Sequence, residues 1–297
     1  MPILTVIHRT RYRYRKPVSF GEHRMMMRPR DTEDQRQLGA TLDIEPAPSE
    51  LRWLQDVFGN NVAIARFHRR SAELVVTNTL RIGHSGVDRP VESWISFYAR
   101  TTPFSYDADE MPDLLRMMER FYPDPAHELD RWARSFLRQD GPTATLDLLE
   151  AMTRSIRRQI TYKGRQSSGI QTPVETLRLG TGTCRDFAVL MIEALRCLGF
   201  AARFVSGYIY VPPPGDTVPD THRGGGNTHA WVQVYLPGAG WVEFDPTNNI
   251  IGSRDLIRVC VVRDPRQAVP LSGTWSGSAT DCLGMDVTVD VTCAKDG

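Results

Sequence analysis

The sequence has few cysteines, and they are not spaced as metal ligands or disulfide frameworks usually are. Five cysteines occur in 297 residues, an odd number, and no two of them form a CxxC pair. Zinc knuckles and disulfide-stapled folds are therefore both disfavoured. We expect a reducing, cytoplasmic location, in which a catalytic thiol survives. The cysteines are Cys184, Cys197, Cys260, Cys282 and Cys293.

The chain also lacks an excess of charge of either sign and lacks long apolar runs. Lys and Arg number 36 against 35 Asp and Glu, which leaves a net charge of +1. Nucleic acids and anionic membranes attract clustered positive charge, so we expect neither as a partner. No apolar run approaches the roughly 20 residues of a membrane-spanning helix. Residues 1–7 are too short for the apolar core of a signal peptide, and the oligomeric state is left open.

Residues 1–100 show the two-residue alternation of β-strands, for example at residues 11–14. Residues 58–62 combine Gly and Asn as a tight hairpin turn does. Because 297 residues leave room for two domains, we predict an N-terminal antiparallel β-sandwich domain over residues 1–100. Trp53 and the three methionines at 25–27 are expected to fill its core.

Beyond residue 100 the periodicity becomes helical, and the predicted second domain covers residues 101–297. A capping box is predicted at Thr172, where Pro173 follows and Glu175 stands three residues later. Alternating strands within residues 255–297 could pack back on the N-terminal domain. Helices are predicted at residues 111–115, 126–137, 145–160 and 172–177, and the fold class is α+β.

Cys184 is the candidate nucleophile. It opens an apolar stripe at helical spacing, which places its sulfur in the first turn of a helix. Unpaired N–H groups and the helix dipole favour a thiolate at that position. Cys197 lies inside the stripe as a buried apolar residue would, and nothing in the sequence activates the other cysteines. The stripe consists of Phe187, Leu190, Met191, Ala194, Leu195 and Leu198.

His229 and Asp245 are the candidate partners of this thiol. His229 opens an apolar strand, and Asp245 ends the next one, after a turn at residues 237–240. Counting back from the turn places the two residues roughly opposite each other, where the carboxylate can orient the imidazole. A thiol, an imidazole and a carboxylate are the nucleophile, base and orienting group of covalent acyl transfer. The alternative is a structural histidine and an aspartate that caps a turn.

These segments resemble the transglutaminase-like superfamily, whose core is a permuted relative of the papain-like cysteine proteases. The resemblance implies a core of helices packed on an antiparallel sheet, with Cys184 as nucleophile, His229 as general base and then acid, and Asp245 as orienting residue. Residues 10–14 and 27–30 look like the β domain that precedes this core in bacterial members. The resemblance rests on residues 182–188, 195–203, 205–208, 229–232 and 240–247.

The implied reaction is attack of the Cys184 thiolate on an amide carbonyl, which forms a thioester and releases an amine. Water then completes hydrolysis of a peptide or protein substrate, or a second amine completes transamidation. The oxyanion needs donors, and the backbone N–H of Cys184 is one candidate. Papain-like enzymes place a Gln shortly before the Cys, but residues 176–179 contain none. Tyr162, Trp231 or Trp241 is therefore expected to supply the second donor, with Tyr162 preferred. A non-catalytic peptide-binding module is the alternative from another class.

Two further features bear on cofactors and access. Residues 211–227 are rich in Pro and Gly and form either a solvent loop or a lid over the thiol. His222 and His229, with Asp216 and Asp220, are irregularly spaced for a metal site, and no acidic loop suggests the calcium site of animal transglutaminases. We therefore expect no metal and no cofactor.

Overall fold

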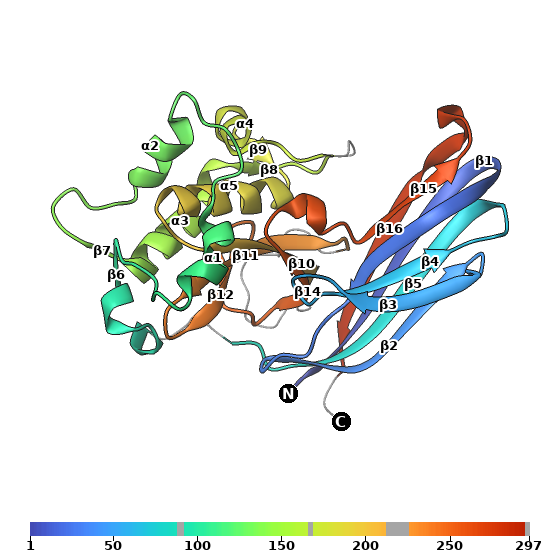
Figure 1. Ribbon diagram of the computed structural model, residues 1–297, viewed down its shortest axis with the longest axis horizontal. Coiled ribbons are helices and arrows are strands. Elements are labelled where there is room, and N and C mark those ends of the chain that lie inside the picture. The colour runs from blue at the N-terminus through green and yellow to red at the C-terminus, as the bar shows by residue number, and fades with distance from the viewer. Residues whose placement is uncertain (88–91, 166–168, 212–225, 295–297) are drawn as a thin grey trace.

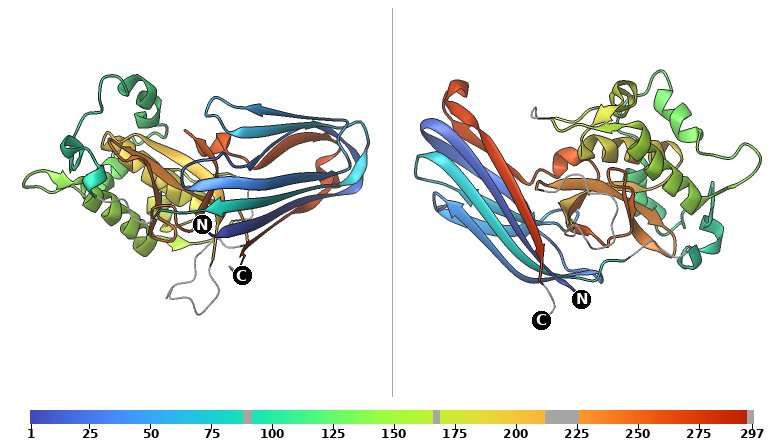
Figure 2. Two further views of the ribbon diagram at one scale, coloured as in Figure 1. Left: turned by 90° about the horizontal axis from the view of Figure 1, so that it is seen from below. Right: turned by 180° about the vertical axis from the view of Figure 1, so that it is seen from behind.

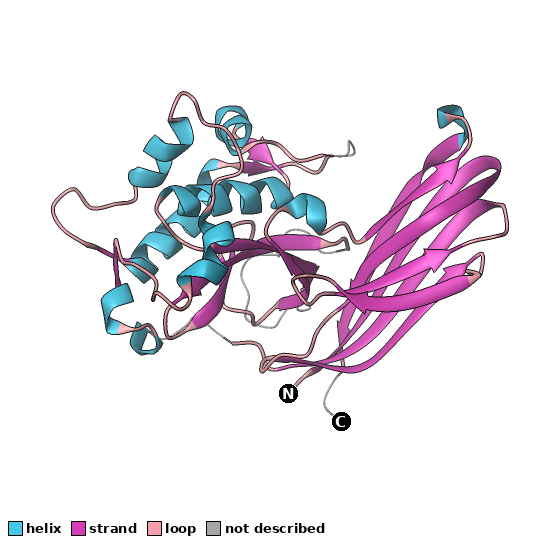
Figure 3. Ribbon diagram, viewed as in Figure 1, coloured by secondary structure: helices cyan, strands magenta, loops and turns pink. Residues whose placement is uncertain are grey.

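The computed structural model describes residues 1–87, 92–165, 169–211 and 226–294. Its elements form two bodies that lie side by side, a β body and a mixed body of helices and strands (Figure 1, Figure 3). The first five strands and the last two make the β body, and the elements between them make the mixed body. The predicted α+β class is confirmed.

One strand organises the β body. β1 (Ile3–Arg28) is 26 residues long and belongs to two layers. Its first half lies between β5 (Ser71–His84) and β16 (Cys282–Cys293), and its second half lies between β4 (Asn61–Arg66) and β15 (Leu271–Ser276). Figure 2 shows β1 in blue beside β16 in red. β2 (Gln35–Glu45) extends the first layer and β3 (Glu50–Gln55) extends the second.

The methionine run follows the alternation of β1. Met25 and Met27 are buried between the two layers, as predicted, whereas Met26 is buried against the mixed body. The prediction for Trp53 is wrong, because its side chain is 38% exposed on β3. The Arg28 guanidinium lies over the Trp53 ring, 3.9 Å from its centroid, and shields one face of it.

A curled antiparallel sheet forms the centre of the mixed body, with strand order β13, β12, β11, β10, β14. Alternate residues of β11, Ala230, Val232 and Val234, join the core that the buried side of helix α5 (Cys184–Cys197) fills. This arrangement is the predicted packing of helices on an antiparallel sheet. The strands are β10 (Ala202–Ile209), β11 (His229–Leu236), β12 (Gly240–Asp245), β13 (Ile250–Ile251) and β14 (Leu256–Val262).

Four further α-helices surround α5 in the described part of the chain. They are α1 (Met111–Met118), α2 (Glu128–Arg134), α3 (Thr145–Gln159) and α4 (Pro173–Leu179). Short strand pairs join β6 (Thr101–Thr102) to β7 (Thr143–Ala144) and β8 (Thr161–Tyr162) to β9 (Thr181–Gly182). The predicted capping box at Thr172 and Glu175 begins α4. None of the described helices is long and apolar enough to cross a membrane.

Buried polar contacts join the two bodies. Arg258 on β14 donates from Nη2 to Asp34 Oδ1 of the β body at 2.9 Å, and its Nη1 pairs with Glu243 on β12. The side-chain amide of Gln35 exchanges two hydrogen bonds with the backbone of Arg258, at 2.8 and 2.9 Å. His8 on β1 pairs with the Tyr208 hydroxyl on β10 at 2.9 Å. Each body therefore supplies hydrogen-bond partners for polar groups of the other body.

We predict that Arg258→Met lowers the free energy of unfolding by about 3–5 kcal/mol, because it leaves the buried Glu243 carboxylate without its cation. Chemical denaturation at pH 7 measures the change. Arg13→Met is the matched control, because Arg13 pairs with Asp286 on the surface at side-chain exposures of 44% and 58%. That variant should lose no more than about 1 kcal/mol. An equal loss of unfolding free energy in both variants would show that the contacts of Arg258 stabilise the protein no more than a surface ion pair does.

Candidate active site

Cys184 is the first residue of α5 and is 7% exposed. Thr183 caps the helix, and its side chain accepts from the Asp186 N–H. In return, Asp186 Oδ2 accepts from the Thr183 N–H at 2.8 Å and from the Thr183 hydroxyl at 2.9 Å. This reciprocal capping box fixes where the helix starts and hence where the sulfur lies.

Asp186 also holds the segment that precedes α4. Its second oxygen, Oδ1, accepts from the Gln171 N–H at 2.8 Å and from Arg165 Nη2 at 3.2 Å. The carboxylate is buried, and it links the helix that Cys184 begins to the side of the cleft on which Arg165 lies. Sequence reasoning missed this role, although the spacing of Thr183 and Asp186 is that of a capping box.

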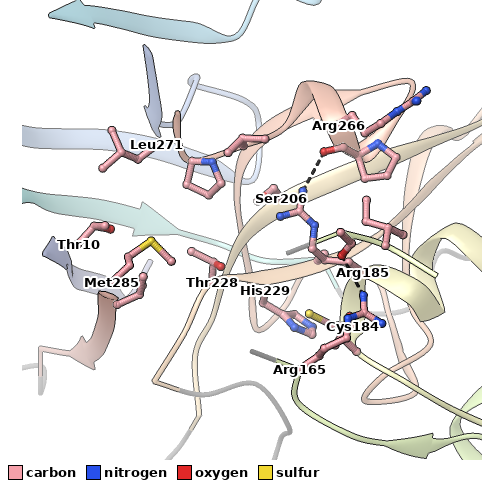
Figure 4. Close-up of a pocket in the computed structure, with 18 of the residues that line it drawn as sticks. Thr10, Arg165, Cys184, Arg185, Ser206, Thr228, His229, Arg266, Leu271 and Met285 are labelled. Carbon is pink, nitrogen blue, oxygen red and sulfur yellow. Dashed lines mark hydrogen bonds between the residues drawn. The ribbon is translucent and has the colours of Figure 1, made fainter. Parts of the chain in front are cut away.

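His229 lies between the thiol and Asp245. Its Nε2–H donates to Asp245 Oδ2 at 2.8 Å, and both side chains are fully buried. Nδ1 has no nitrogen or oxygen partner among the described residues, and the Cys184 sulfur lies beside the ring (Figure 4). Burial acts to lower the pKa of His229, but the charge and hydrogen bond of Asp245, together with Cys184, raise it to about 10. The site therefore favours an imidazolium beside the sulfur.

Asp245 is held in place from the turn that follows β12. Its Oδ1 accepts from the Thr247 N–H at 2.8 Å, and its Oδ2 accepts from Asn248 Nδ2 at 2.8 Å. Burial acts to raise the pKa of Asp245, but His229 and these hydrogen bonds lower it. Asn248 Nδ2 also lies 3.3 Å from His229 Nε2. Asn248 was missed from the sequence, where only its place three residues after Asp245 marks it.

Trp231 supports the histidine and is not available as an oxyanion donor. Its ring stacks on His229 with centroids 5.8 Å apart and planes at 28°, and its indole N–H donates to Glu243. The Trp231 ring needs the space beside Gly207, the residue of β10 that pairs with His229. A Cβ on Gly207 would lie 2.7 Å from the ring and 2.0 Å from the Ile257 carbonyl oxygen.

Tyr162 remains the predicted second oxyanion donor. It pairs in parallel with Gly182, two residues before Cys184, and its ring meets the Phe187 ring of α5 edge-on, with centroids 6.2 Å apart. The Trp241 ring lies instead under the Arg203 guanidinium, with the ring centroid 3.9 Å from Arg203 Cζ, and it also contacts the Tyr235 ring. Trp241 therefore packs near the opposite end of the β11–β12 hairpin from His229.

The thiol opens into a cleft of about 610 Å³ between the two bodies. Cys184, His229 and Arg185 lie on the side of the mixed body, and Thr10, Leu271 and Met285 lie across from them (Figure 4). The β body is thus part of the site, which the sequence did not indicate. The loop predicted as a lid at residues 211–227, with His222, Asp216 and Asp220, lies almost wholly outside the described residues. Within the described ranges no group of three or more His, Cys, Asp or Glu could hold a metal.

Comparison with known sequences identifies the family. Residues 131–246 match the transglutaminase-like superfamily, and residues 4–82 match the bacterial transglutaminase-like N-terminal region. An uncharacterised protein of Mycobacterium tuberculosis is 30% identical over 303 residues, which cover 96% of this chain and 91% of the relative. One from Mycobacterium leprae is 28% identical over 305 residues, covering 97% and 98%. The chain belongs to the transglutaminase-like superfamily.

Among solved structures, a candidate cysteine protease from Cytophaga hutchinsonii resembles the whole chain. The TM-score is 0.71 at 20% identity, and the match covers 100% of this chain and 92% of the other. At this identity the likeness shows the fold, and it confirms the predicted transglutaminase-like architecture. Members of the superfamily are typically enzymes, either cysteine proteases or transglutaminases.

Asp245→Asn should slow alkylation of Cys184 by iodoacetamide at pH 6 by about tenfold or more. The variant removes the charge that raises the His229 pKa to about 10, so burial then lowers this pKa and the imidazolium is lost at pH 6. One pKa unit corresponds to about tenfold. Peptide mass spectrometry against pH measures the rate, and the difference should narrow above about pH 9, where free thiols ionise unaided.

Cys197 provides the control within each sample. Burial raises the pKa of its thiol to about 11, so it should react slowly in both proteins below pH 9. Identical Cys184 profiles in wild type and Asp245→Asn would show that the carboxylate does not support the imidazolium.

Proposed function

We propose that this protein is a cysteine-dependent amide hydrolase that acts on peptide or protein amides through a thioester intermediate. The observation that carries the proposal is the His229 imidazole, with the Cys184 sulfur on one side and the buried Asp245 carboxylate on the other. A histidine with a raised pKa favours an ion pair with the thiol, and a thiolate is the reactive form of cysteine. A cytoplasmic location, as expected from the free thiols, belongs to the same proposal.

The reaction runs in two halves. The Cys184 sulfur attacks the amide carbonyl, and His229 then gives its proton to the departing amine, which leaves a thioester on the sulfur. A water molecule that passes a proton to His229 attacks the thioester and releases the acid. Asp245 stays ionised throughout and keeps the imidazole in one orientation.

The oxyanion of each half requires hydrogen-bond donors. The N–H groups of Cys184 and Arg185, at the free end of α5, donate to no acceptor among the described residues. We propose the Cys184 N–H as one donor and the Tyr162 hydroxyl as the second, on the basis of the pairing of Tyr162 with Gly182. Losing one such donor typically costs 10²–10³ in rate, so Tyr162→Phe should fall in that range.

We predict that the purified protein cleaves amides in a mixture of proteome-derived peptides, with new termini identified by mass spectrometry. Cys184→Ser and His229→Gln should each lower the rate by about 10³-fold or more, as for other triads. Cys282→Ser is the control, because this exposed thiol lies outside the cleft lining and should not be needed.

A labelled primary amine and a glutamine-rich acceptor protein, added to the same assay, separate the alternatives. Incorporation of the label that requires Cys184, without new peptide termini, would replace hydrolysis by transamidation. Peptide binding without either product, in a protein whose Cys184 reacts no faster than Cys282, would favour the binding module.

A further inference from the structure

The residue after the nucleophile places a positive charge in the cleft. The Arg185 guanidinium lines the cleft and extends from the start of α5 toward the segment that contains Arg266 (Figure 4). Its Nη2 donates to the Pro265 carbonyl oxygen at 2.8 Å and to the Ala268 carbonyl oxygen at 3.3 Å. Both acceptors are neutral carbonyl groups, and the negative charges of Asp186 and Asp264 act on the Arg185 guanidinium only through space, without a direct hydrogen bond.

Other arginines near the cleft have a carboxylate of their own. Arg165 pairs with Asp186 at 3.2 Å, and Arg266 pairs with Asp264 at 2.8 Å. In the part of the chain that the structure describes, no carboxylate forms an ion pair with Arg185. Burial lowers the pKa of Arg185, which reflects the cost of desolvating its charge. An anion that entered the cleft would offset that cost.

The composition of the cleft points the same way. Its described lining contains three arginines and no Asp or Glu. Because Arg165 and Arg266 are paired with Asp186 and Asp264, Arg185 is the arginine of the described lining that has no carboxylate in an ion pair. A cleft lined by one sign of charge concentrates ligands of the opposite sign. The facing wall from the β body is mixed, because β1 contributes His8, Thr10 and Tyr12 and the later strands contribute the apolar side chains of Leu271, Met285 and Val287. The ligand that fits both walls is a chain with an apolar part and a carboxylate.

We propose that Arg185 binds a carboxylate of the substrate close to the scissile amide, so that the enzyme prefers acidic peptides. This inference rests on the proposed amide hydrolase function and specifies its substrate class. Arginine suits the task because its planar guanidinium binds a carboxylate through charge-assisted hydrogen bonds. Arg185 Nη1 has no hydrogen-bond partner among the described residues and is not one of their buried unpaired atoms, so it is the donor left for the substrate.

The first test uses affinity probes that need no knowledge of the substrate. N-iodoacetylglycine and N-iodoacetylglycinamide both alkylate Cys184: the thiolate forms an S–CH₂ bond and displaces iodide, so the rest of the reagent stays attached to the sulfur, but only the first reagent carries a carboxylate. A second pair built on β-alanine extends the reach by one CH₂. The wild type should react about tenfold faster with the acid than with the amide in at least one pair, as expected for a hydrogen bond to a charged group. Added salt should reduce this ratio.

Variants separate recognition from effects on the thiol. Arg185→Gln should bring the ratio of acid to amide rates to about one, and Arg185→Lys should restore part of it. Arg266→Gln is the matched control, because this arginine lines the same cleft but is already paired with Asp264, and it should keep the ratio. A wild-type ratio near one in both pairs, or Arg185→Gln slowing both probes equally, would overturn the proposal.

Two peptide series then identify the source of the carboxylate. One compares Glu with Gln beside the scissile bond, and the other compares a free C-terminal carboxylate with its amide. A preference that needs Arg185 in the first series indicates an acidic side chain, and one in the second indicates a chain terminus. Rapid alkylation by all probes without an acid preference would refute this inference and leave the proposed function standing. Failure of Cys184 to react with any probe would refute both.

Discussion

Arg258 connects the two bodies to the candidate site, because it pairs with Asp34 of the β body and with Glu243 on β12 of the mixed body. The Glu243 carboxylate is buried, and burial raises its pKa despite the opposing charge of Arg258. The same carboxylate accepts from the indole N–H of Trp231, whose ring stacks on His229. Since Arg258 also reaches Asp34, one buried charge cluster connects the β body to the face of the imidazole.

The candidate site needs both bodies, because each body forms one side of the cleft. The thiol and imidazole come from the mixed body, but the cleft that gives access to them exists only where the β body approaches. Its far wall is built from β1 and β16, which pair antiparallel over residues 4–14 and 282–293. A change in the tilt between the bodies would alter the width of the cleft while leaving Cys184, His229 and Asp245 together.

Much of the candidate site follows from local sequence patterns, and the rest depends on distant contacts. Cys184, His229 and Asp245 could be found because helix starts and hairpin turns are local, and the structure brings the three together. The direction of the Trp231 indole could not be predicted, because its N–H donates to Glu243 and so is not available at the thiol. The exposure of Trp53, and the fact that no carboxylate of the described residues forms an ion pair with Arg185, were likewise hidden, since each depends on which distant segments pack nearby. The 26-residue length of β1 was also missed, because its alternation is interrupted where it passes between layers.

The pairing of β1 with β16 has a consequence for biosynthesis. β1 precedes Cys184, His229 and Asp245 in the sequence, whereas β16, the strand that completes the cleft wall beside β1, follows them. Cys184, His229 and Asp245 are all translated before this wall, so they can meet while one side of the cleft is still missing. The cleft wall beside β1 is therefore completed only after β16 has been synthesised and has paired with β1.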